Sequence, residues 1–225
     1  MSNDDQAATA RRLREDLTAA LAAGDKAAAV RAALRVVESG ELGVVALYRE
    51  VLTPLLIETG DGWQRGSVRI WEEHLASATI RTIVEALYPR VLQAKAARPA
   101  AGRSVVLACP PEEGHDLGLR MVADRFEMAG WSTYFIGADT PLDELVDAGR
   151  RLGVEAVALS LSTHFHKVAL RGLVERLRRA LPGVRIWLGG PAFRSGCEGW
   201  EDELLDLEAL LGGDDVPIAG GDRPC

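Results

Sequence analysis

A loop near the middle of the chain places an imidazole beside a carboxylate. Within residues 110–118, Glu113 precedes His115 by two positions and Gly118 follows it by three. Imidazole is a good ligand for a transition metal, and a carboxylate bound to its second nitrogen fixes the tautomer and raises the basicity of the ring. The pair therefore predicts a metal ligand with a supporting carboxylate, and the alternative is two solvated loop residues.

A second carboxylate–imidazole pair, Glu73 and His74, follows Trp63 after an interval of nine residues. It falls in an expected helix over residues 67–88, whose apolar stripe advances in steps of three and four through Ile70, Glu73, Ser77, Ile80, Val84 and Leu87. A carboxylate on a buried stripe is costly unless a polar group meets it, and His74 lies about 100° further round the helix. Two interpretations stay open: a polar ligand site, or Trp63 as a staple at the helix start with Glu73 and His74 partly exposed.

Other residues with metal or redox chemistry form weaker patterns. His164 and His166 make a His-x-His pair, but no third ligand accompanies them, so an ordinary loop is expected there. The three cysteines, Cys109, Cys197 and Cys225, are odd in number and widely spaced. They predict neither a zinc site nor a disulfide framework, and they suit a reduced cytoplasm.

Short apolar runs alternate with helix-like stretches in the second half of the chain. Strands are expected at residues 104–109, 132–136, 156–160 and 185–188, and helices at residues 117–129, 142–152 and 168–181. This alternation predicts an α/β fold with an open, doubly wound, Rossmann-like parallel sheet. Ligands of such sheets bind beyond the carboxyl ends of the strands, where the loop with His115 lies. A weak fifth strand near residues 197–200 and a helix over 202–211 complete the expected elements.

The first hundred residues predict helix throughout. The expected segments are residues 4–23, 26–39, 41–59 and 67–88. Pro54 is expected to kink the third segment and Gly60–Gly62 to end it, while Ser67 should cap the fourth and Pro89 should end it. Amphipathic helices joined by short turns that contain glycine predict an antiparallel four-helix bundle.

Length and charge narrow the function classes. The 225 residues suit two domains, with a bundle over residues 4–97, a sheet domain over 103–211 and a disordered tail over 212–225. The 26 basic residues are outnumbered by 33 acidic ones, which gives a formal net charge of −7. Such a chain lacks the basic footprint of direct nucleic-acid binding or of attachment to anionic membranes. No apolar run reaches the roughly 18 residues of a membrane span, and no signal peptide is evident, so we expect a cytoplasmic protein.

Three short motifs resemble those of the cobalamin-binding domain family. They are Glu113-x-His115-x-x-Gly118 after the first expected strand, Ser160-x-Ser162 after the third and Gly189-Gly190 after the fourth. The family carries a [DE]xHxxG, SxL and GG series in the same order on a sheet of the same kind, and Ser162 stands where leucine is usual. The shared order and strand-end positions make the resemblance specific.

This resemblance implies cobalamin as the cofactor. His115 would be the lower axial cobalt ligand in place of the cofactor's own dimethylbenzimidazole base, with Glu113 as its hydrogen-bond partner. Ser160 would line the channel for the freed nucleotide tail, and Gly189 and Gly190 would leave room where a side chain would collide; a simple turn is the alternative for the glycine pair. The other cofactor-binding residues implied are Asp116, Leu117, Gly118 and Ser162.

The N-terminal bundle is similar to the four-helix cap of cobalamin-binding domains of the methionine synthase type. Its Trp63-x9-Glu73-His74 arrangement closely resembles the cap of CarH-type light-responsive regulators, which use adenosylcobalamin as their chromophore. The resemblance implies that Trp63 packs over the upper axial group and that Glu73 contacts the adenosyl moiety. His74 would become a second cobalt ligand after light breaks the cobalt–carbon bond, and methylcobalamin is the other cofactor form considered.

Those regulators begin with a basic DNA-binding domain, whereas this sequence starts directly in the expected bundle. We therefore expect a non-enzymatic sensor that signals through a protein partner, through a change of oligomeric state or through a separate effector, without direct contact to nucleic acid. The leading alternative is the corrinoid carrier subunit of a methyltransferase system, which shares the cap and the histidine motif. A module for cobalamin storage or trafficking is a third hypothesis.

Overall fold

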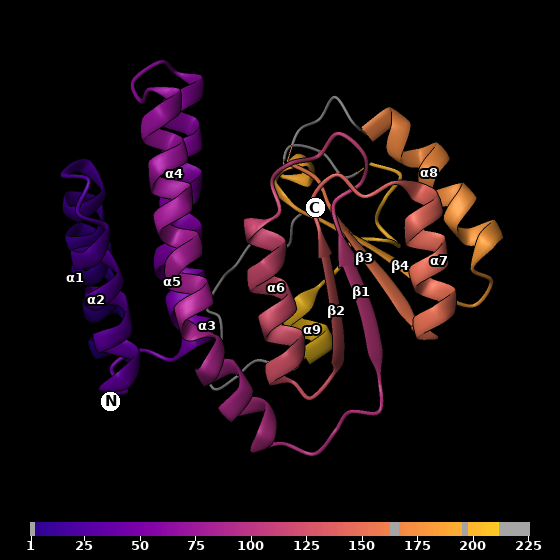
Figure 1. The fold of residues 1–225 in the computed structure, drawn as a ribbon, viewed down its shortest axis with the longest axis horizontal. Helices are drawn as coiled ribbons and strands as arrows, with labels where there is room; N and C mark the ends of the chain where they lie inside the picture. Colours follow the sequence, from indigo (N-terminus) through magenta and orange to yellow (C-terminus); the bar gives the residue numbers. More distant parts are fainter. Residues whose placement is uncertain (1–2, 163–166, 195–197, 212–225) are drawn as a thin grey trace. The chain divides into compact units, whose positions relative to one another are not determined.

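The computed structural model describes residues 3–162, 167–194 and 198–211. The chain divides into two compact units, Met1–Gln93 and Ala94–Cys225, which are described separately below (Figure 1). His164, His166, Cys197, Cys225 and the expected tail over 212–225 lie outside the described residues. In the part of the chain that is described, no helix is both long and apolar enough to span a membrane.

The first unit is helical, and its rods run alternately up and down in Figure 1. Its elements are α1 (Asn3–Ala22), α2 (Lys26–Glu38), α3 (Val44–Leu47), the π-helical segment η1 (Tyr48–Leu52), α4 (Thr53–Gln64) and α5 (Ile70–Ala96). The Asp25 carboxylate caps α2 by accepting a hydrogen bond from the Ala28 N–H at 2.9 Å. Since α3, η1 and α4 follow one another without a break, they form one rod. The predicted four-helix arrangement is confirmed.

The third rod continues past the glycines that were predicted to end it. Helix α4 runs through Gly60 and Gly62 to Gln64. A Cβ on Gly62 would lie 2.6 Å from Cγ2 of Val68, so this glycine lets the following loop approach the helix instead of stopping it. At Pro54, which lies in the first turn of α4, the predicted kink is replaced by the π-helical turn just before it.

The last helix of this unit differs from prediction at both ends. Ser67 is not its cap, because the Ser67 hydroxyl donates to the Gly62 carbonyl at 3.0 Å. Helix α5 begins at Ile70, where the Glu72 carboxylate accepts from the Arg69 N–H at 2.7 Å. The helix also continues through Pro89 to Ala96. Burial of Leu87 and Val91 on either side of the proline outweighs the local cost of its missing N–H, about 3 kcal/mol.

The second unit is built on a four-stranded parallel sheet. Its strands are β1 (Ser104–Ala108), β2 (Ser132–Gly137), β3 (Ala156–Ser160) and β4 (Arg185–Gly189), in the spatial order β2-β1-β3-β4. Its helices are α6 (Leu117–Met128), α7 (Leu142–Leu152), α8 (Lys167–Ala180), the 3-10 turn η3 (Pro191–Phe193) and α9 (Leu207–Leu211). The α/β class and the doubly wound parallel sheet are confirmed, and strand β1 lies between β2 and β3.

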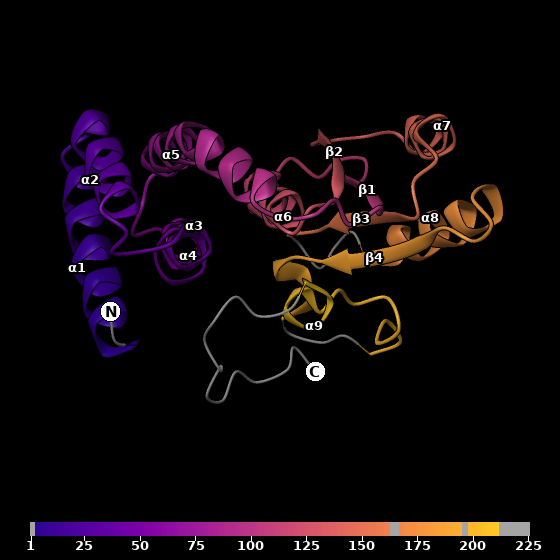
Figure 2. The same ribbon diagram turned by 90° about the horizontal axis from the view of Figure 1, so that it is seen from below.

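The two faces of the sheet have separate cores. One face packs Leu107 and Ala158 against Phe126 of α6, with Trp131 and Trp187 around that ring. The other face packs against the apolar side chains of α7 and α8. Figure 1 and Figure 2 together show α6 and α9 on one side of the sheet and α7 and α8 on the other. Alternating strand residues therefore point to different helix layers.

The chain after β4 departs from the prediction. Among the described residues 198–200 there is no strand. Further along the chain, Leu204 forms an isolated parallel bridge with Leu188 of β4. The Leu188 N–H donates to the Glu203 carbonyl at 2.8 Å, and the Leu205 N–H donates to the Leu188 carbonyl at 2.9 Å. Because residues 203–205 pair with β4, the helix expected over 202–211 is reduced to α9.

Candidate functional site

A buried carboxylate joins two loops at the carboxyl edge of the sheet. The Glu113 side chain, in the loop between β1 and α6, is only 1% exposed. Its Oε1 accepts the His115 backbone N–H at 2.9 Å and lies 2.6 Å from Nδ1 of the His115 ring. Its Oε2 accepts the backbone N–H of Ser162 at 2.7 Å. Glu113 therefore holds the imidazole and also ties the loop after β1 to the loop after β3.

The charge state of Glu113 fixes the tautomer of His115. Burial alone would raise the pKa of Glu113, but the hydrogen bonds from the His115 ring and from the Ser162 and His115 backbones outweigh it, so the pKa is lowered. An ionised carboxylate only accepts hydrogen bonds, so Nδ1 of His115 must carry the proton and donate. In the neutral ring the lone pair is then on Nε2, in a side chain that is 69% exposed. This is the state in which an imidazole can bind a metal.

The loop after β2 supports the segment that carries Glu113. Asp139 Oδ1 accepts the Glu112 N–H at 2.8 Å, and the Asp139 N–H donates to the Glu113 carbonyl at 2.9 Å. The Thr140 N–H donates to the carbonyl of Cys109 at 3.0 Å. Glu112 and Asp139 both adopt positive φ, at 68° and 47°. Asp139 and Thr140 were not predicted from the sequence. The signal available there was an aspartate, which tolerates a left-handed backbone, in the turn after the second strand.

Of the other residues predicted in the loop after β1, some face the interior and one borders open space. Leu117 is buried at the start of α6. The Asp116 carboxylate lies near Gly137, where an added Cβ would be 3.3 Å from Oδ2. At Gly118 an added Cβ would meet nothing within 4 Å. Beneath this loop, burial raises the pKa of the Cys109 thiol to about 12, with the nearby Glu113 and Asp116 carboxylates adding to the effect, so Cys109 stays neutral.

The two adjacent glycines after β4 have different roles. Gly190 has a φ of +102°, and a Cβ there would lie 2.3 Å from the Leu161 carbonyl oxygen and 2.8 Å from the Ser160 hydroxyl. At Gly189 a Cβ would meet nothing within 4 Å. Gly190 is therefore required by the protein's own backbone, whether or not a ligand binds. Gly189 is the member of the pair that borders space a ligand could use.

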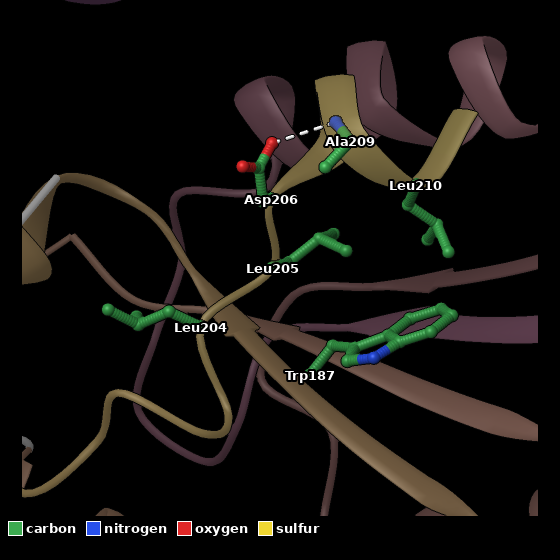
Figure 3. Close-up of a pocket in the computed structure, with 6 residues that line it drawn as sticks. All are labelled: Trp187, Leu204, Leu205, Asp206, Ala209 and Leu210. Atoms are coloured by element: carbon green, nitrogen blue, oxygen red, sulfur yellow. Dashed lines mark hydrogen bonds between the residues drawn. The ribbon is translucent and has the colours of Figure 1, made fainter. Parts of the chain in front are cut away.

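A shallow pocket lies on the face of the sheet that Gly189 shares with Ser160. These two residues pair across β3 and β4, and strand alternation puts them on the same face as Ala158 and Trp187. The pocket has a volume of about 300 Å³ and is lined by Trp187, Leu204, Leu205, Asp206, Ala209 and Leu210 (Figure 3). Toward the strand ends, this face carries the small residues Ser160 and Gly189.

The second predicted pair lies on α5 in the helical unit. Glu73 Oε2 is 2.6 Å from Nδ1 of His74, and the Ser77 hydroxyl donates to Glu73 Oε1 at 2.5 Å. The polar groups that meet this carboxylate therefore come from its own helix. The His74 side chain is 70% exposed, and that of Glu73 is 23% exposed.

Exposed apolar side chains surround the start of α5. Ile70 is 56% exposed, so the predicted core stripe is wrong at its first position, although it is buried from Ile80 onward. Trp63, near the end of α4, is 47% exposed and does not act as a buried staple. Trp71 and Leu75 are also exposed. The helical unit thus combines an exposed imidazole with exposed large apolar groups.

Comparisons with known proteins bear on both units. A model described as a B12 binding domain matches residues 103–213, and a second model with the same description matches residues 13–88. The chain is 35% identical to the HTH-type transcriptional repressor CarH of Myxococcus xanthus over 149 residues, which is 66% of this chain and 48% of that protein. It is 31% identical to the HTH-type transcriptional repressor CarA of the same organism, over 62% of this chain and 45% of that protein. The chain thus spans about half the length of these two relatives.

Corrinoid proteins are also similar to this chain. Dimethylamine corrinoid protein 1 of Methanosarcina acetivorans is 24% identical over 170 residues, covering 73% of this chain and 76% of that protein. The structure of a monomethylamine corrinoid protein from Methanosarcina barkeri superposes with a TM-score of 0.70 at 17% identity and covers 91% of both chains. At that identity the structural match establishes a shared fold.

Proposed function

Because the chain belongs to the B12-binding domain family, with family models matching both units, we propose that it is a light sensor whose chromophore is an alkylcobalamin, with adenosylcobalamin as the leading form. One observation carries the proposal: each unit presents an exposed imidazole whose Nδ1 is held by a carboxylate, His115 by Glu113 and His74 by Glu73. A corrinoid carrier needs one such histidine. A switch between two ligation states uses two.

Several features of the sheet unit support a cobalamin site there. His115 would bind cobalt through Nε2, and Glu113 would hold the ring in the orientation for this. Open space at Gly118 and Gly189 leaves room for the corrin ring and the nucleotide tail. We propose that the tail runs along the sheet face of Ser160 and Gly189 toward the pocket beside Trp187.

The helical unit supplies the proposed light response. A bound alkylcobalamin contributes a cobalt–carbon bond that light can break. We propose that Trp63 would pack against the alkyl group of the bound cofactor and that Glu73 would contact it, while His74 would supply a second nitrogen ligand to cobalt once light has broken the cobalt–carbon bond. The similarity to CarH, which covers 66% of this chain, supports this assignment. Binding of His74 would bias the protein between two states, and the output would pass to a protein partner or to self-association.

Illumination should convert the adenosylcobalamin-loaded protein to a stable species with a nitrogen ligand on each side of cobalt. Free adenosylcobalamin, illuminated in the same buffer, gives aquocobalamin and serves as the control. The measurement is the absorption spectrum before and after light, followed by gel filtration to show that the corrinoid stays bound and whether the oligomeric state changes. Formation of aquocobalamin that separates from the protein would contradict the proposal.

His74→Ala should separate dark binding from the light response. Its affinity for adenosylcobalamin in the dark is expected to stay within about twofold of the unmodified protein, because a lower ligand at His115 is unaffected. Its illuminated product should instead carry water on the upper side, since no imidazole is available from α5. If the illuminated spectra of the two proteins coincide, His74 is not the upper ligand.

The alternative function is a corrinoid carrier for methyl transfer, which the similarity to the dimethylamine corrinoid protein favours. A carrier loaded with methylcobalamin would pass its methyl group to a thiol acceptor when the partner methyltransferase is present. The dark, methyl-loaded protein can be tested for this transfer directly. Methyl transfer combined with an illuminated product identical to that of free cobalamin would favour the carrier.

A further inference from the structure

We propose that Asp139 is a positioning residue for the cobalt-binding imidazole, acting through its hydrogen bonds to the N–H of Glu112 and to the carbonyl of Glu113. The inference rests on the proposed role of His115 as lower ligand. Asp139 lies in the loop after β2, outside the three motifs that carry the family resemblance. It reaches the site because β2 and β1 are neighbours in the sheet.

Asp139 holds the Glu113 segment at two points. Its carboxylate accepts the N–H of Glu112 at 2.8 Å, and its own N–H donates to the carbonyl of Glu113 at 2.9 Å. One residue therefore binds the backbone at Glu112 and at Glu113. Because the Glu113 carboxylate fixes the orientation of the His115 ring, a shift of the backbone at residues 112 and 113 would change the direction in which Nε2 points.

Both residues joined by this contact have a left-handed backbone conformation. Glu112 and Asp139 have φ values of 68° and 47°, a conformation that is uncommon for glutamate and that aspartate tolerates better. Asp139 is exposed, and so is its bond to Glu112. A solvent-exposed bond adds little to overall stability, so the consequence of losing it should appear in the geometry of the site more than in the melting temperature.

Three variants separate the hydrogen bond from the backbone conformation. Asp139→Asn keeps an acceptor oxygen and tolerates positive φ, whereas Asp139→Gly tolerates positive φ but has no acceptor. Glu112→Gly relieves the strain at residue 112 and keeps the donated N–H, so it is the matched control. Each is made in the full chain labelled with 15N-histidine.

Binding of cob(II)alamin is measured by absorbance titration, and the axial nitrogen is identified by electron paramagnetic resonance. A 15N imidazole splits the cobalt lines into doublets, whereas the 14N benzimidazole of the cofactor gives triplets. We expect Asp139→Gly to weaken binding about tenfold and to give a mixture of the two patterns. Asp139→Asn and Glu112→Gly should stay within about twofold of the unmodified protein and give doublets.

The cofactor-free protein gives an independent readout. Long-range 15N–1H spectra report the tautomer of His115, whose signal is assigned by its loss in His115→Ala. Asp139→Gly should lower the Nδ1–H population, while its melting temperature stays close to that of Asp139→Asn. Unchanged affinity, splitting pattern and tautomer in Asp139→Gly would overturn the inference. If His115→Ala itself keeps the doublets, the lower-ligand assignment fails instead, and the tautomer measurement still decides whether Asp139 positions the ring.

Discussion

Replacement of His115 by alanine is expected to weaken cobalamin binding by at least about tenfold and to leave the benzimidazole base of the cofactor on cobalt. The reason lies in the Glu113–His115 contact at 2.6 Å, which holds the proton on Nδ1 and the lone pair on Nε2. Without the imidazole, no other described side chain of this loop offers a neutral nitrogen. The corrinoid then keeps its own intramolecular ligand, and its nucleotide tail has no reason to leave the corrin.

The measurement is the electron paramagnetic resonance spectrum of cob(II)alamin bound to protein labelled with 15N-histidine. The unmodified protein should show doublets, and His115→Ala should show triplets from the benzimidazole nitrogen. His74→Ala is the matched control, because it removes the other carboxylate-bound imidazole and should keep both the doublets and the affinity. Doublets in His115→Ala would show that a different histidine binds cobalt from below.

The second large effect is expected from one added methyl group at Gly190. An alanine there must adopt a φ of +102° with its Cβ 2.3 Å from the Leu161 carbonyl oxygen. Backbone strain and overpacking together should lower the free energy of unfolding by about 3 kcal/mol. For a chain of this size the melting temperature should fall by on the order of 10 °C. Thermal and urea unfolding of the cofactor-free protein, followed by tryptophan fluorescence, measures the change.

Gly189→Ala is the matched control because it adds the same methyl group one residue earlier, into open space. Its stability should stay within about 0.5 kcal/mol of the unmodified protein or rise slightly, since glycine disfavours strand conformation. Its affinity for cobalamin should fall by about tenfold if the nucleotide tail passes over Gly189. Cobinamide, which has no nucleotide tail, should bind Gly189→Ala and the unmodified protein with equal affinity. Equal loss of stability in the two variants would contradict the distinction between the glycines.

Several features of the fold and the site could be predicted from short segments of sequence. The alternation of apolar runs with helical stretches predicted where the four strands lie in the sequence and that they form a parallel sheet, because each run is a local pattern. The rule that ligands bind at the carboxyl ends of parallel strands then placed Glu113 and His115 at the functional edge. Their spacing of two residues also let one carboxylate reach the neighbouring ring.

Helix ends were predicted less well, since they depend on packing elsewhere in the chain. Pro89 and Gly62 are helix-breaking residue types, yet both lie inside helices. Burial of Leu87 and Val91 keeps the helix going past the proline, and Val68 occupies the space beside Gly62. Local propensity is a weak prior that tertiary contacts override.

The sequence by itself determined the kind of protein: an α/β cobalamin-binding domain after a helical unit, with a carboxylate–imidazole pair in each unit. Only the tertiary structure decided how the pair at the sheet edge is held. Glu113 meets Ser162 across 49 residues and its backbone meets Asp139, because β1 lies between β2 and β3. The tertiary structure also showed that a side chain at residue 190 would collide with the Leu161 carbonyl oxygen, whereas a side chain at residue 189 would not. Contacts of this kind follow from which strands become neighbours, and no periodicity within a segment encodes them.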